Sequence, residues 1–253
     1  GLGFANVDLK TRTNSTFGFT QISDSDSHMA WQVLAGAARD QARPKRDARI
    51  GMLPPKLAQT MVNIATGSQT EGTVLDPFCG SGVVLQEALL AGFKTVGSDI
   101  EPRMVEYARQ NIEWLRSVSG FKGKLVSLRT ADAASFRWPE SNGLRAVASE
   151  IYLGPAFGGK PSPSAVAKAA DSVNDLLRAV LKNLAGQTRP GLRLCLAVPC
   201  WRTPEGFKRL PIIDHLPKLG YNRLGFDHVA NEDLVYIRPG QWVGRELLVL
   251  IKA

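Results

Sequence analysis

The sequence predicts an α/β fold in which a mostly parallel sheet carries helices on both faces. Short apolar runs alternate with helical patterns, giving five strand-then-helix steps before a group of strands at the C-terminus. A turn of small residues at 76–82 joins one strand to a helix, and an acid, Asp99, ends the next strand. In such a sheet, ligands bind beyond the carboxyl ends of the strands. The turn therefore predicts where the functional site lies.

The composition suits a large globular domain with a polyanionic partner. The chain has 253 residues, 44% of them hydrophobic, which is enough for a sizeable core and argues against disorder. A net charge of +8 and a pI near 9.6 favour nucleic acid over an acidic membrane. Three scattered cysteines and three scattered histidines give neither a disulfide framework nor metal-ligand spacing. No apolar run approaches 18 residues and no signal peptide is present, so a cytoplasmic protein without a membrane partner is expected.

The first 42 residues are predicted to be an extension or a connection, because the segment is too short for a typical domain. Strands are expected at 1–9 and 15–22, and a helix at 28–39. The basic run at 39–49 is either a solvated linker or a patch that contacts RNA phosphates. The candidate RNA-binding side chains are Arg43, Lys45, Arg46, Arg49 and Lys56.

A helix is predicted to begin around Pro54 and Pro55, since proline is tolerated in a first helical turn. Apolar residues then recur on one helical face, at Leu57, Met61, Ile64 and Ala65. After a polar loop the chain continues as a short apolar strand at 73–75, which leads into the turn at 76–82.

The turn Asp-Pro-Phe-Cys-Gly-Ser-Gly at 76–82 is suited to a cationic ligand. Gly80 and Gly82 allow a sharp turn and a close approach of the backbone to a ligand. The Gly-Lys-Ser/Thr of a phosphate loop is missing, and so is the third glycine of a dinucleotide fingerprint. Asp76 would repel phosphates but would attract an ammonium or a sulfonium group. The alternative is an ordinary glycine-rich connection between a strand and a helix.

Two stretches together resemble one enzyme family. The turn at 76–82 looks like the first S-adenosylmethionine (SAM) motif of class I methyltransferases, in the branch that acts on amino groups of nucleic-acid bases. Before it, residues 43–58 read Arg-Pro-x-Arg-Asp-x-Arg-x-Gly-Met-Leu-Pro-Pro-Lys-Leu-Ala. The two stretches in this order are similar to the archaeal-type tRNA guanine-N2 methyltransferases, which modify the guanine at position ten of tRNA.

The resemblance implies a class I, Rossmann-like methyltransferase domain at 43–253, with SAM as cofactor and tRNA as partner. It implies a seven-stranded, mostly parallel sheet with one antiparallel strand. Members of the family usually carry an N-terminal RNA-binding THUMP domain, for which this chain has no room. Residues 1–42 would then be the remnant of a connection to such a domain, and a partner or a missing N-terminal segment would supply RNA binding.

Two acids after the turn are expected to bind the nucleoside part of SAM. Asp99 lies 23 residues after Asp76, at a strand end, where an acid accepts from ribose hydroxyls in dinucleotide folds. It can also cap the helix expected at 101–117. The resemblance implies that Asp132, after a strand at 124–128, accepts from the adenine amine, with a polar turn as the alternative. The predicted cofactor-binding residues are Asp76, Pro77, Phe78, Cys79, Gly80, Gly82, Asp99, Ile100, Asp132 and Ala133.

A strand at 144–149 leads into the predicted catalytic residues, Glu150, Ile151 and Tyr152. Amino-methyltransferases carry an Asp/Asn/Ser-Pro-Pro-aromatic motif here, in which a side-chain oxygen and a backbone carbonyl hold the amine and the ring stacks on a flipped-out base. This chain departs from the motif, because glutamate stands for the acceptor, isoleucine for the first proline, and the aromatic comes early. A second register, 154–157, keeps one proline and an aromatic but loses the acceptor.

The rest of the chain predicts a long helix, a fifth strand and a C-terminal strand group. The helix follows Pro163, the strand covers 193–198, and a loop at 199–204 carries Trp201, which would meet the substrate or pack in the core. The later elements are a helix at 211–219 before Gly220, strands at 222–229 and 234–238, and a closing strand at 245–252. In Arg-Pro-Gly-Gln-x-Val-Gly-Arg-Glu at 238–246, which is also similar to the family, Arg238 and Arg245 would face RNA or form a charged turn.

The resulting functional hypothesis is SAM-dependent methylation of the exocyclic N2 amine of guanine in tRNA. An rRNA guanine-N2 enzyme or a DNA amino-methyltransferase would share the turn motif, although the stretch at 43–58 favours tRNA. A non-catalytic RNA-binding protein with the same fold is the alternative from another class, motivated by the altered motif at 150–152.

Overall fold

The computed structural model describes residues 40–46, 52–119 and 121–253. The chain divides into two units, Gly1–Ala42 and Arg43–Ala253. Of the first unit, only 40–42 is described, and it is helical. The strands expected at 1–9 and 15–22 and the helix expected at 28–39 lie outside the described residues. The role of this unit as an extension or a connection stays a prediction.

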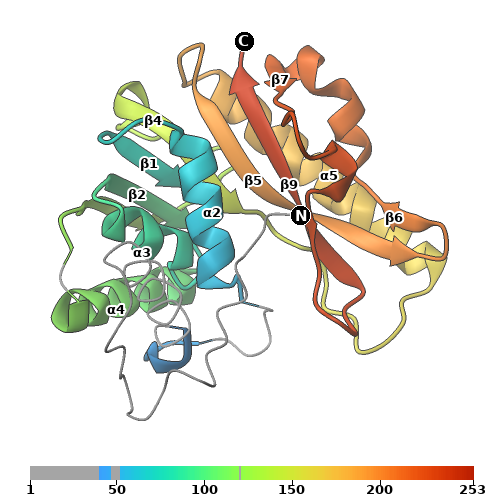
Figure 1. Cartoon of the computed structure of the whole chain (residues 1–253), viewed down its shortest axis with the longest axis horizontal. Coiled ribbons are helices and arrows are strands. Elements are labelled where there is room, and N and C mark those ends of the chain that lie inside the picture. The colour runs from blue at the N-terminus through green and yellow to red at the C-terminus, as the bar shows by residue number, and fades with distance from the viewer. Residues whose placement is uncertain (1–39, 47–51, 120) are drawn as a thin grey trace. The chain divides into compact units, whose positions relative to one another are not determined.

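One sheet organises the second unit (Figure 1). Its strand order is β3-β2-β1-β4-β5-β9-β7, and the first five strands in this order are parallel. These strands are β3 (Lys124–Thr130), β2 (Lys94–Asp99), β1 (Thr73–Asp76), β4 (Leu144–Glu150), β5 (Arg193–Thr203), β9 (Val243–Lys252) and β7 (Tyr221–Arg223). β9 is antiparallel to both of its neighbours, β5 and β7. The described path therefore confirms the predicted mostly parallel sheet with one antiparallel strand.

Two short strands extend the expected seven to nine. β6 (Gly206–Lys208) pairs with the end of β5, and β8 (Val235–Tyr236) pairs with the start of β9, both antiparallel. Both are additions beside the ends of long strands, so the order of the main path is unchanged.

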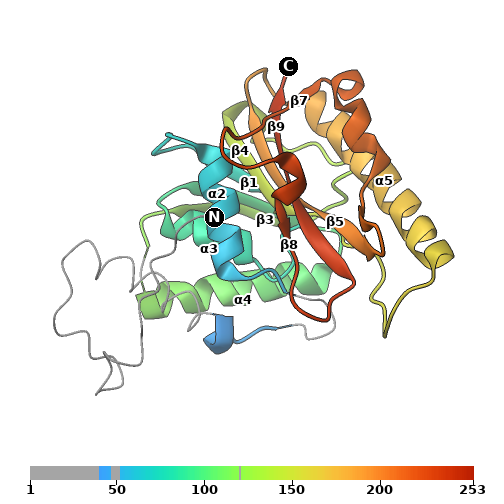
Figure 2. The same cartoon turned by 45° about the vertical axis from the view of Figure 1, so that its right-hand side comes forward.

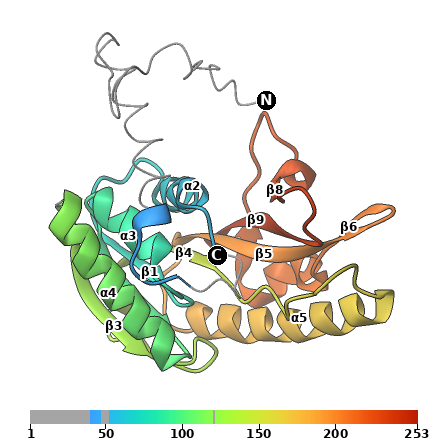
Figure 3. The same cartoon turned by 90° about the horizontal axis from the view of Figure 1, so that it is seen from below.

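Helices cover both faces of the sheet, as predicted. α2, α3 and α4 pack on one face, and α5 with the 3₁₀ helix η3 packs on the other (Figures 2 and 3). Their bounds are α2 (Pro55–Thr66), α3 (Val83–Leu90), α4 (Pro102–Ser119), α5 (Pro163–Ala185) and η3 (Pro211–Leu219), with shorter 3₁₀ turns η2 (Ser141–Gly143) and η4 (Asn231–Asp233). The connections from β1 to β2 and from β2 to β3 run through α3 and α4 on one face of the sheet. The connection from β4 to β5 runs through α5 on the other face. This change of face is the topological switch beside which ligands bind in open α/β sheets.

The two faces of the central strands carry side chains of different size. Toward α2 they present small groups, including Ala146, Ala148 and Cys195, whereas toward α5 they present Val147 and Leu194. Small side chains let a helix axis approach the sheet closely, and successive residues of a strand point to opposite faces. Because helices cover both faces, the central strand β4 is buried on both sides.

The predicted length of β5 was too short, and the predicted lengths of the two strands after η3 were too long. β5 continues to Thr203, through most of the loop predicted at 199–204, because β9 pairs with it as far as Trp201 and β6 pairs with it from Trp201 to Thr203. Ala197 O accepts from Ile151 N, so Pro199, two residues later, turns its nitrogen to the side where β4 has ended. The strands expected at 222–229 and 234–238 shrink to Tyr221–Arg223 and Val235–Tyr236.

A buried carboxylate ties β9 to two arginines on the η3 side of the sheet. Glu246 has no exposed surface, its Oε1 lies 2.8 Å from Arg223 Nη2, and its Oε2 lies 3.6 Å from Arg209 Nε. A buried charge that loses its partner is costly, because its desolvation is no longer compensated.

We expect Glu246→Gln to lower the free energy of unfolding by about 2 kcal/mol, because the amide leaves two arginines without a counter-charge. Denaturant unfolding measures the change. The matched control is Glu106→Gln, which removes an exposed carboxylate paired with Arg109 and should cost at most about 0.5 kcal/mol. Equal effects of the two substitutions would contradict a structural role of the buried cluster.

Candidate functional site

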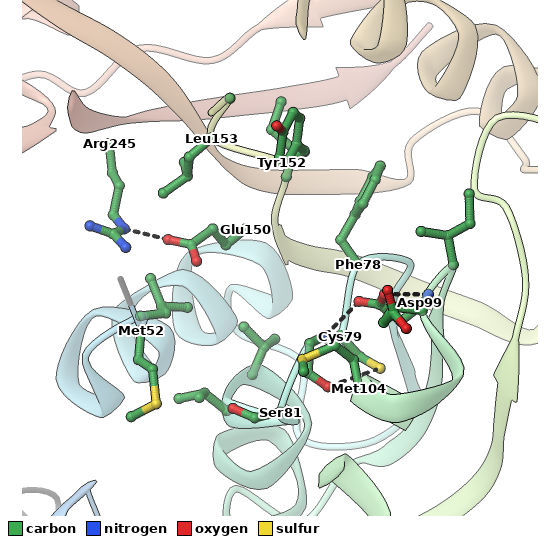
Figure 4. Close-up of a pocket in the computed structure, with 18 of the residues that line it drawn as sticks. Met52, Phe78, Cys79, Ser81, Asp99, Met104, Glu150, Tyr152, Leu153 and Arg245 are labelled. Carbon is green, nitrogen blue, oxygen red and sulfur yellow. Dashed lines mark hydrogen bonds and ion pairs between the residues drawn. The ribbon is translucent and has the colours of Figure 1, made fainter. Parts of the chain in front are cut away.

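A pocket of about 840 Å³ opens at the carboxyl ends of β1, β2, β3 and β4 (Figure 4). It contains every residue predicted to bind the cofactor or to hold the substrate amine, except Gly82. These lining residues are Asp76, Pro77, Phe78, Cys79, Gly80, Asp99, Ile100, Asp132, Ala133, Glu150, Ile151 and Tyr152. The topology thus brings together segments that are more than 70 residues apart in the sequence.

The loop between β1 and α3 is held in place by backbone hydrogen bonds. Cys79 N donates to Ser98 O at 2.9 Å, and Gly80 N donates to Asp99 Oδ2 at 2.9 Å. Gly80 and Gly82 have φ of 48° and 85°, in the left-handed region that favours glycine. A Cβ on Gly82 would lie 3.0 Å from Ala108 Cβ, so this glycine permits close packing of α4 instead of lining the pocket.

Asp76 is a buried acid at the floor of the pocket, 1% exposed. Its Oδ1 accepts from Ser149 Oγ at 2.6 Å and from Phe78 N at 3.3 Å. Oδ2 accepts no hydrogen bond from the described residues. Burial raises the pKa of Asp76 to about 7, although the hydrogen bonds from Ser149 and Phe78 oppose the rise. The site therefore carries an acid that ionises near neutral pH and can pair with a cation.

Asp99, at the end of β2, serves the loop as well as the pocket. Its Oδ2 accepts from Gly80 N, and its Oδ1 accepts from Glu101 N at 3.0 Å, which forms a turn ahead of α4 but binds none of the N–H groups of the helix that the sequence expected it to cap. Burial raises its pKa, and the backbone hydrogen bonds from Glu101 and Gly80 oppose that rise. Each carboxylate oxygen has a second lone pair, so the group can still accept from a ligand.

Asp132, beyond β3, is exposed and lines the pocket. Its Oδ1 accepts from Ala134 N at 2.9 Å, and its Oδ2 accepts from Ser135 Oγ at 3.3 Å. The carboxylate thus orders its own turn, which is the alternative expected from the sequence, while remaining beside the pocket.

Glu150 ends β4 and forms an ion pair with Arg245 of β9 (Figure 4). Arg245 is 3% exposed, so it is neither the RNA-facing side chain nor the charged turn that the sequence allowed. Burial raises the pKa of Glu150, whereas the adjacent Arg245 guanidinium lowers it. Ile151 is buried and Tyr152 is 50% exposed, so the ring stands at the rim of the pocket. The segment 153–157, which includes the second register, also lines the pocket.

Sequence reasoning missed two walls of the pocket. Met52 and Leu53, before α2, form one of them, and residues 240–243 with Arg245 form the other. The motif at 238–246 resembled the family but carried no sign of where its residues would lie, because their position depends on how β9 pairs with β5. Trp201 is fully buried in the core, which is the second of the two roles expected for it.

The basic residues proposed to bind RNA divide into three groups. Arg46 and Lys56 are exposed, and Lys45 is partly exposed, with its Nζ 5.7 Å from the centre of the Tyr107 ring. Arg43 is 3% exposed, contrary to the prediction of a phosphate-binding side chain. The physical reason is that Asn111 of α4 binds both the N–H and the carbonyl of Lys45, which draws the segment onto the domain. Arg49 lies outside the described residues.

The described residues hold no group of three His, Cys, Asp or Glu side chains placed to bind a metal ion. The cysteines Cys79, Cys195 and Cys200 are free and buried. Burial, reinforced by Asp76 and Asp99, raises the pKa of the Cys79 thiol well above its usual range, so this pocket cysteine is a neutral thiol. Among the described helices, none combines the length and the apolar character that a bilayer crossing requires.

Comparison with protein families identifies a match over most of the second unit. Residues 43–207 match the family described as RMKL-like, methyltransferase domain. The matched segment begins at the basic run before α2 and ends in β6, so it includes the loop at 76–82 and the strand end at Glu150.

Curated relatives are similar over part of their length. The tRNA (guanine(10)-N2)-dimethyltransferase of Methanothermobacter thermautotrophicus is 32% identical over 169 residues, which are 66% of this chain and 45% of the relative. The protein of the same name from Methanocaldococcus jannaschii is 48% identical over 83 residues, 33% of this chain and 22% of the relative. The chain thus spans less than half the length of the curated relatives that it matches.

Solved structures share the fold. TrmN from Thermus thermophilus aligns with a TM-score of 0.52 and 22% identity, covering 81% of this chain and 51% of that chain. Magnesium protoporphyrin IX methyltransferase (ChlM) from Synechocystis PCC 6803, solved with bound SAH, aligns with a TM-score of 0.53 and 16% identity, covering 88% and 97%. At these identities the likeness concerns the fold alone, and it confirms the predicted Rossmann-like methyltransferase architecture.

Proposed function

The chain belongs to the RMKL-like methyltransferase domain family, and from this premise we propose that it transfers a methyl group from SAM to the N2 amine of guanine in tRNA. The observation that carries the proposal is the shared pocket. The loop at 76–82 begins at Asp76, and Asp99 from the end of β2 lines the same pocket, so two acids suited to a cationic nucleoside ligand lie beside Glu150, the carboxylate that ends β4. The names of the curated relatives supply the base and the polymer.

The lining residues fit SAM in size and in charge. A pocket of about 840 Å³ falls in the range of small-molecule sites. Asp76 would pair through its Oδ2 with the ammonium of the methionine part, Asp99 would accept from the ribose hydroxyls, and Asp132 from the adenine amine. SAM supplies an electrophilic methyl group on a sulfonium, so the chain needs no covalent nucleophile.

The remaining pocket residues are proposed to hold the base. An exocyclic amine is a poor nucleophile because its lone pair is delocalised into the ring. Glu150 and the carbonyl of Ile151 would accept its two N–H groups and aim the nitrogen, while the half-exposed ring of Tyr152 stacks on the flipped-out base. SAM would supply the methyl group and would keep the electrons of its S–C bond as a neutral thioether, and Glu150 would accept the proton that N2 loses.

We propose tRNA as the partner, bound in part through the exposed side chains of Arg46 and Lys56. Lys45 and Arg49 belong to the same run, and Arg43 would contribute to it only after leaving its buried position. Since the chain spans less than half of its curated relatives, we propose that a further segment or a separate partner supplies the rest of the RNA contact.

The direct test is methyl transfer from labelled SAM to bulk tRNA, ribosomal RNA and duplex DNA, followed by mass spectrometry of the nucleosides. N2-methylguanosine in tRNA alone is the expected product. Labelled rRNA or DNA with unmodified tRNA would replace the proposed polymer. Full SAM binding without transfer to any nucleic acid would instead favour a non-catalytic RNA-binding protein.

Asp76 gives the cofactor site a pH dependence that can be predicted. Its folded-state pKa, about 7, lies above the ordinary value, so its neutral form stabilises the fold below about pH 4 and this contribution is lost as the pH rises through 7. Pairing with an ammonium requires the ionised form. We expect S-adenosylhomocysteine to bind about 20-fold more weakly at pH 5.5 than at pH 7.5, as measured by calorimetry.

The control for this pH dependence is Asp76→Asn, which should bind weakly at both pH values and lose most of the difference between them. In the ligand-free protein, the same substitution should raise stability more at pH 7.5 than at pH 5.5. An affinity of the unmodified chain that is flat over this interval would rule out Asp76 as the partner of the ammonium.

A further inference from the structure

The register of β4, β5 and β9 places Glu150 and Arg245 on the same face of the sheet, where they form an ion pair in the pocket. Glu150 pairs with Ala197 across β4 and β5, and Ala197 pairs with Leu247 across β5 and β9. Residues that pair across strands share a face, and so does Arg245, two residues before Leu247. Because the side chain between them, Ala197, is a single methyl, Arg245 reaches over β5 to Glu150.

The pair leaves one edge of the carboxylate for a ligand. Arg245 Nε donates to Oε1 of Glu150, and the described residues place no donor on Oε2. Oε1 also keeps a second lone pair, so the group can accept two parallel N–H bonds from a ligand in the pocket. Among the described residues, Arg245 favours the charged form of Glu150, and Glu150 and Asp76 are two acids whose charges oppose each other in the pocket.

Arg245 decides what kind of hydrogen-bonding group Glu150 is. In a site this buried, a lone carboxyl group favours its neutral form, which carries one donor and one acceptor. The guanidinium beside it favours the ionised form, which carries acceptors only. The two forms present opposite patterns to a base, so the arginine controls the pattern.

The bases differ at the edge that a flipped-out nucleotide presents. Guanine carries two adjacent donors, N1–H and the N2 amine. Adenine and cytosine each carry a donor amine beside a ring nitrogen that accepts, N1 in adenine and N3 in cytosine. An ionised carboxylate matches guanine and faces a repulsive lone pair in the other two, whereas a neutral acid or an amide matches adenine and cytosine.

We propose that Arg245 is a specificity-determining residue, which holds Glu150 as a two-acceptor carboxylate that takes guanine and rejects adenine and cytosine. The proposal rests on the proposed function, since it assumes that a base enters beside Glu150. It goes beyond that function by assigning base choice to a pair between β4 and β9.

The test measures binding of GMP, AMP and CMP to the full chain saturated with S-adenosylhomocysteine, by ligand-observed NMR titration. The chain should prefer GMP by about 10- to 100-fold, the discrimination of a bidentate contact. Glu150→Gln should shift the preference toward AMP and CMP, because an amide offers a donor and an acceptor. Arg245→Met should reduce the preference for GMP at least tenfold.

The control variant is Arg223→Met, which removes an arginine from the other carboxylate pair of β9 and should keep the GMP preference. If Arg245→Met fails to fold, as judged by loss of S-adenosylhomocysteine binding, the isosteric Glu150→Gln still tests the proposal. Equal binding of the three nucleotides by the unmodified chain, or no detectable binding of any, would overturn it. So would an unchanged preference in Glu150→Gln.

The two proposals fail separately. A preference for GMP without methyl transfer to tRNA would contradict the proposed function and support the role of Arg245 and Glu150 in base choice. Transfer to guanine by a chain that binds all three nucleotides equally would keep the function and remove the role of Arg245.

Discussion

Replacing Glu150 with alanine is expected to lower the turnover of methyl transfer by about 100- to 1,000-fold while leaving SAM affinity within about twofold. The carboxylate would hold an amine whose lone pair is otherwise delocalised, and its loss removes both the alignment and the acceptor for the departing proton. SAM contacts are proposed to lie on the loop at 76–82 and on Asp99 and Asp132, so they should be unaffected. Single-turnover kinetics and calorimetry measure the two quantities.

A complication of this variant is that alanine leaves Arg245 buried without its carboxylate. The double variant Glu150→Ala with Arg245→Met removes both charges and separates the loss of alignment from the cost of an uncompensated charge. If the double variant recovers turnover, Glu150 serves only to neutralise Arg245. Parallel loss of turnover and SAM binding in both variants would indicate a folding defect and remove the assigned role.

The loop at 76–82, Asp99 and Glu150 could be predicted as site residues because local sequence patterns indicate them. A turn with Gly80 and Gly82 at positive φ, and an acid at the end of the following strand, follow from backbone geometry and from the rule that parallel strands end at one edge. The same rule placed Glu150 at that edge, since it ends a central strand. These positions line one pocket in the structure, and the order of the strands alone is enough to predict that they meet.

The rest of the site depends on pairings between distant segments, which no local pattern encodes. The contact of Glu150 with Arg245 joins residues 95 apart and depends on the register of β5 against β9. A one-residue shift of β9 would exchange Arg245 with Glu246 and turn the arginine to the opposite face. The burial of Arg43 likewise depends on Asn111 in α4, a side chain that the sequence presented only as part of an amphipathic helix.

Asp99→Ala is expected to weaken binding of S-adenosylhomocysteine by about 100-fold, since two ribose hydroxyls lose a charged acceptor worth about 3 kcal/mol in total. The substitution also removes the acceptor for Gly80 N, so part of the effect would come from the loop. Calorimetry gives the affinity. Asp132→Ala is the matched comparison and should cost less, because that exposed carboxylate binds its own turn and would contact one amine.

A thermodynamic cycle that combines the substitution with a modified ligand separates the proposed ribose contact of Asp99 from its hydrogen bond to Gly80 N in the loop. The unmodified chain and Asp99→Ala are each titrated with S-adenosylhomocysteine and with its 2′,3′-dideoxy analogue. If the carboxylate accepts from the diol, the substitution should weaken the parent ligand at least tenfold more than the analogue, which has no hydroxyls to lose. Equal losses for the two ligands would mean that Asp99 acts only through Gly80 and Glu101. Its place at the strand end would then be explained by the shape of the loop rather than by the ribose.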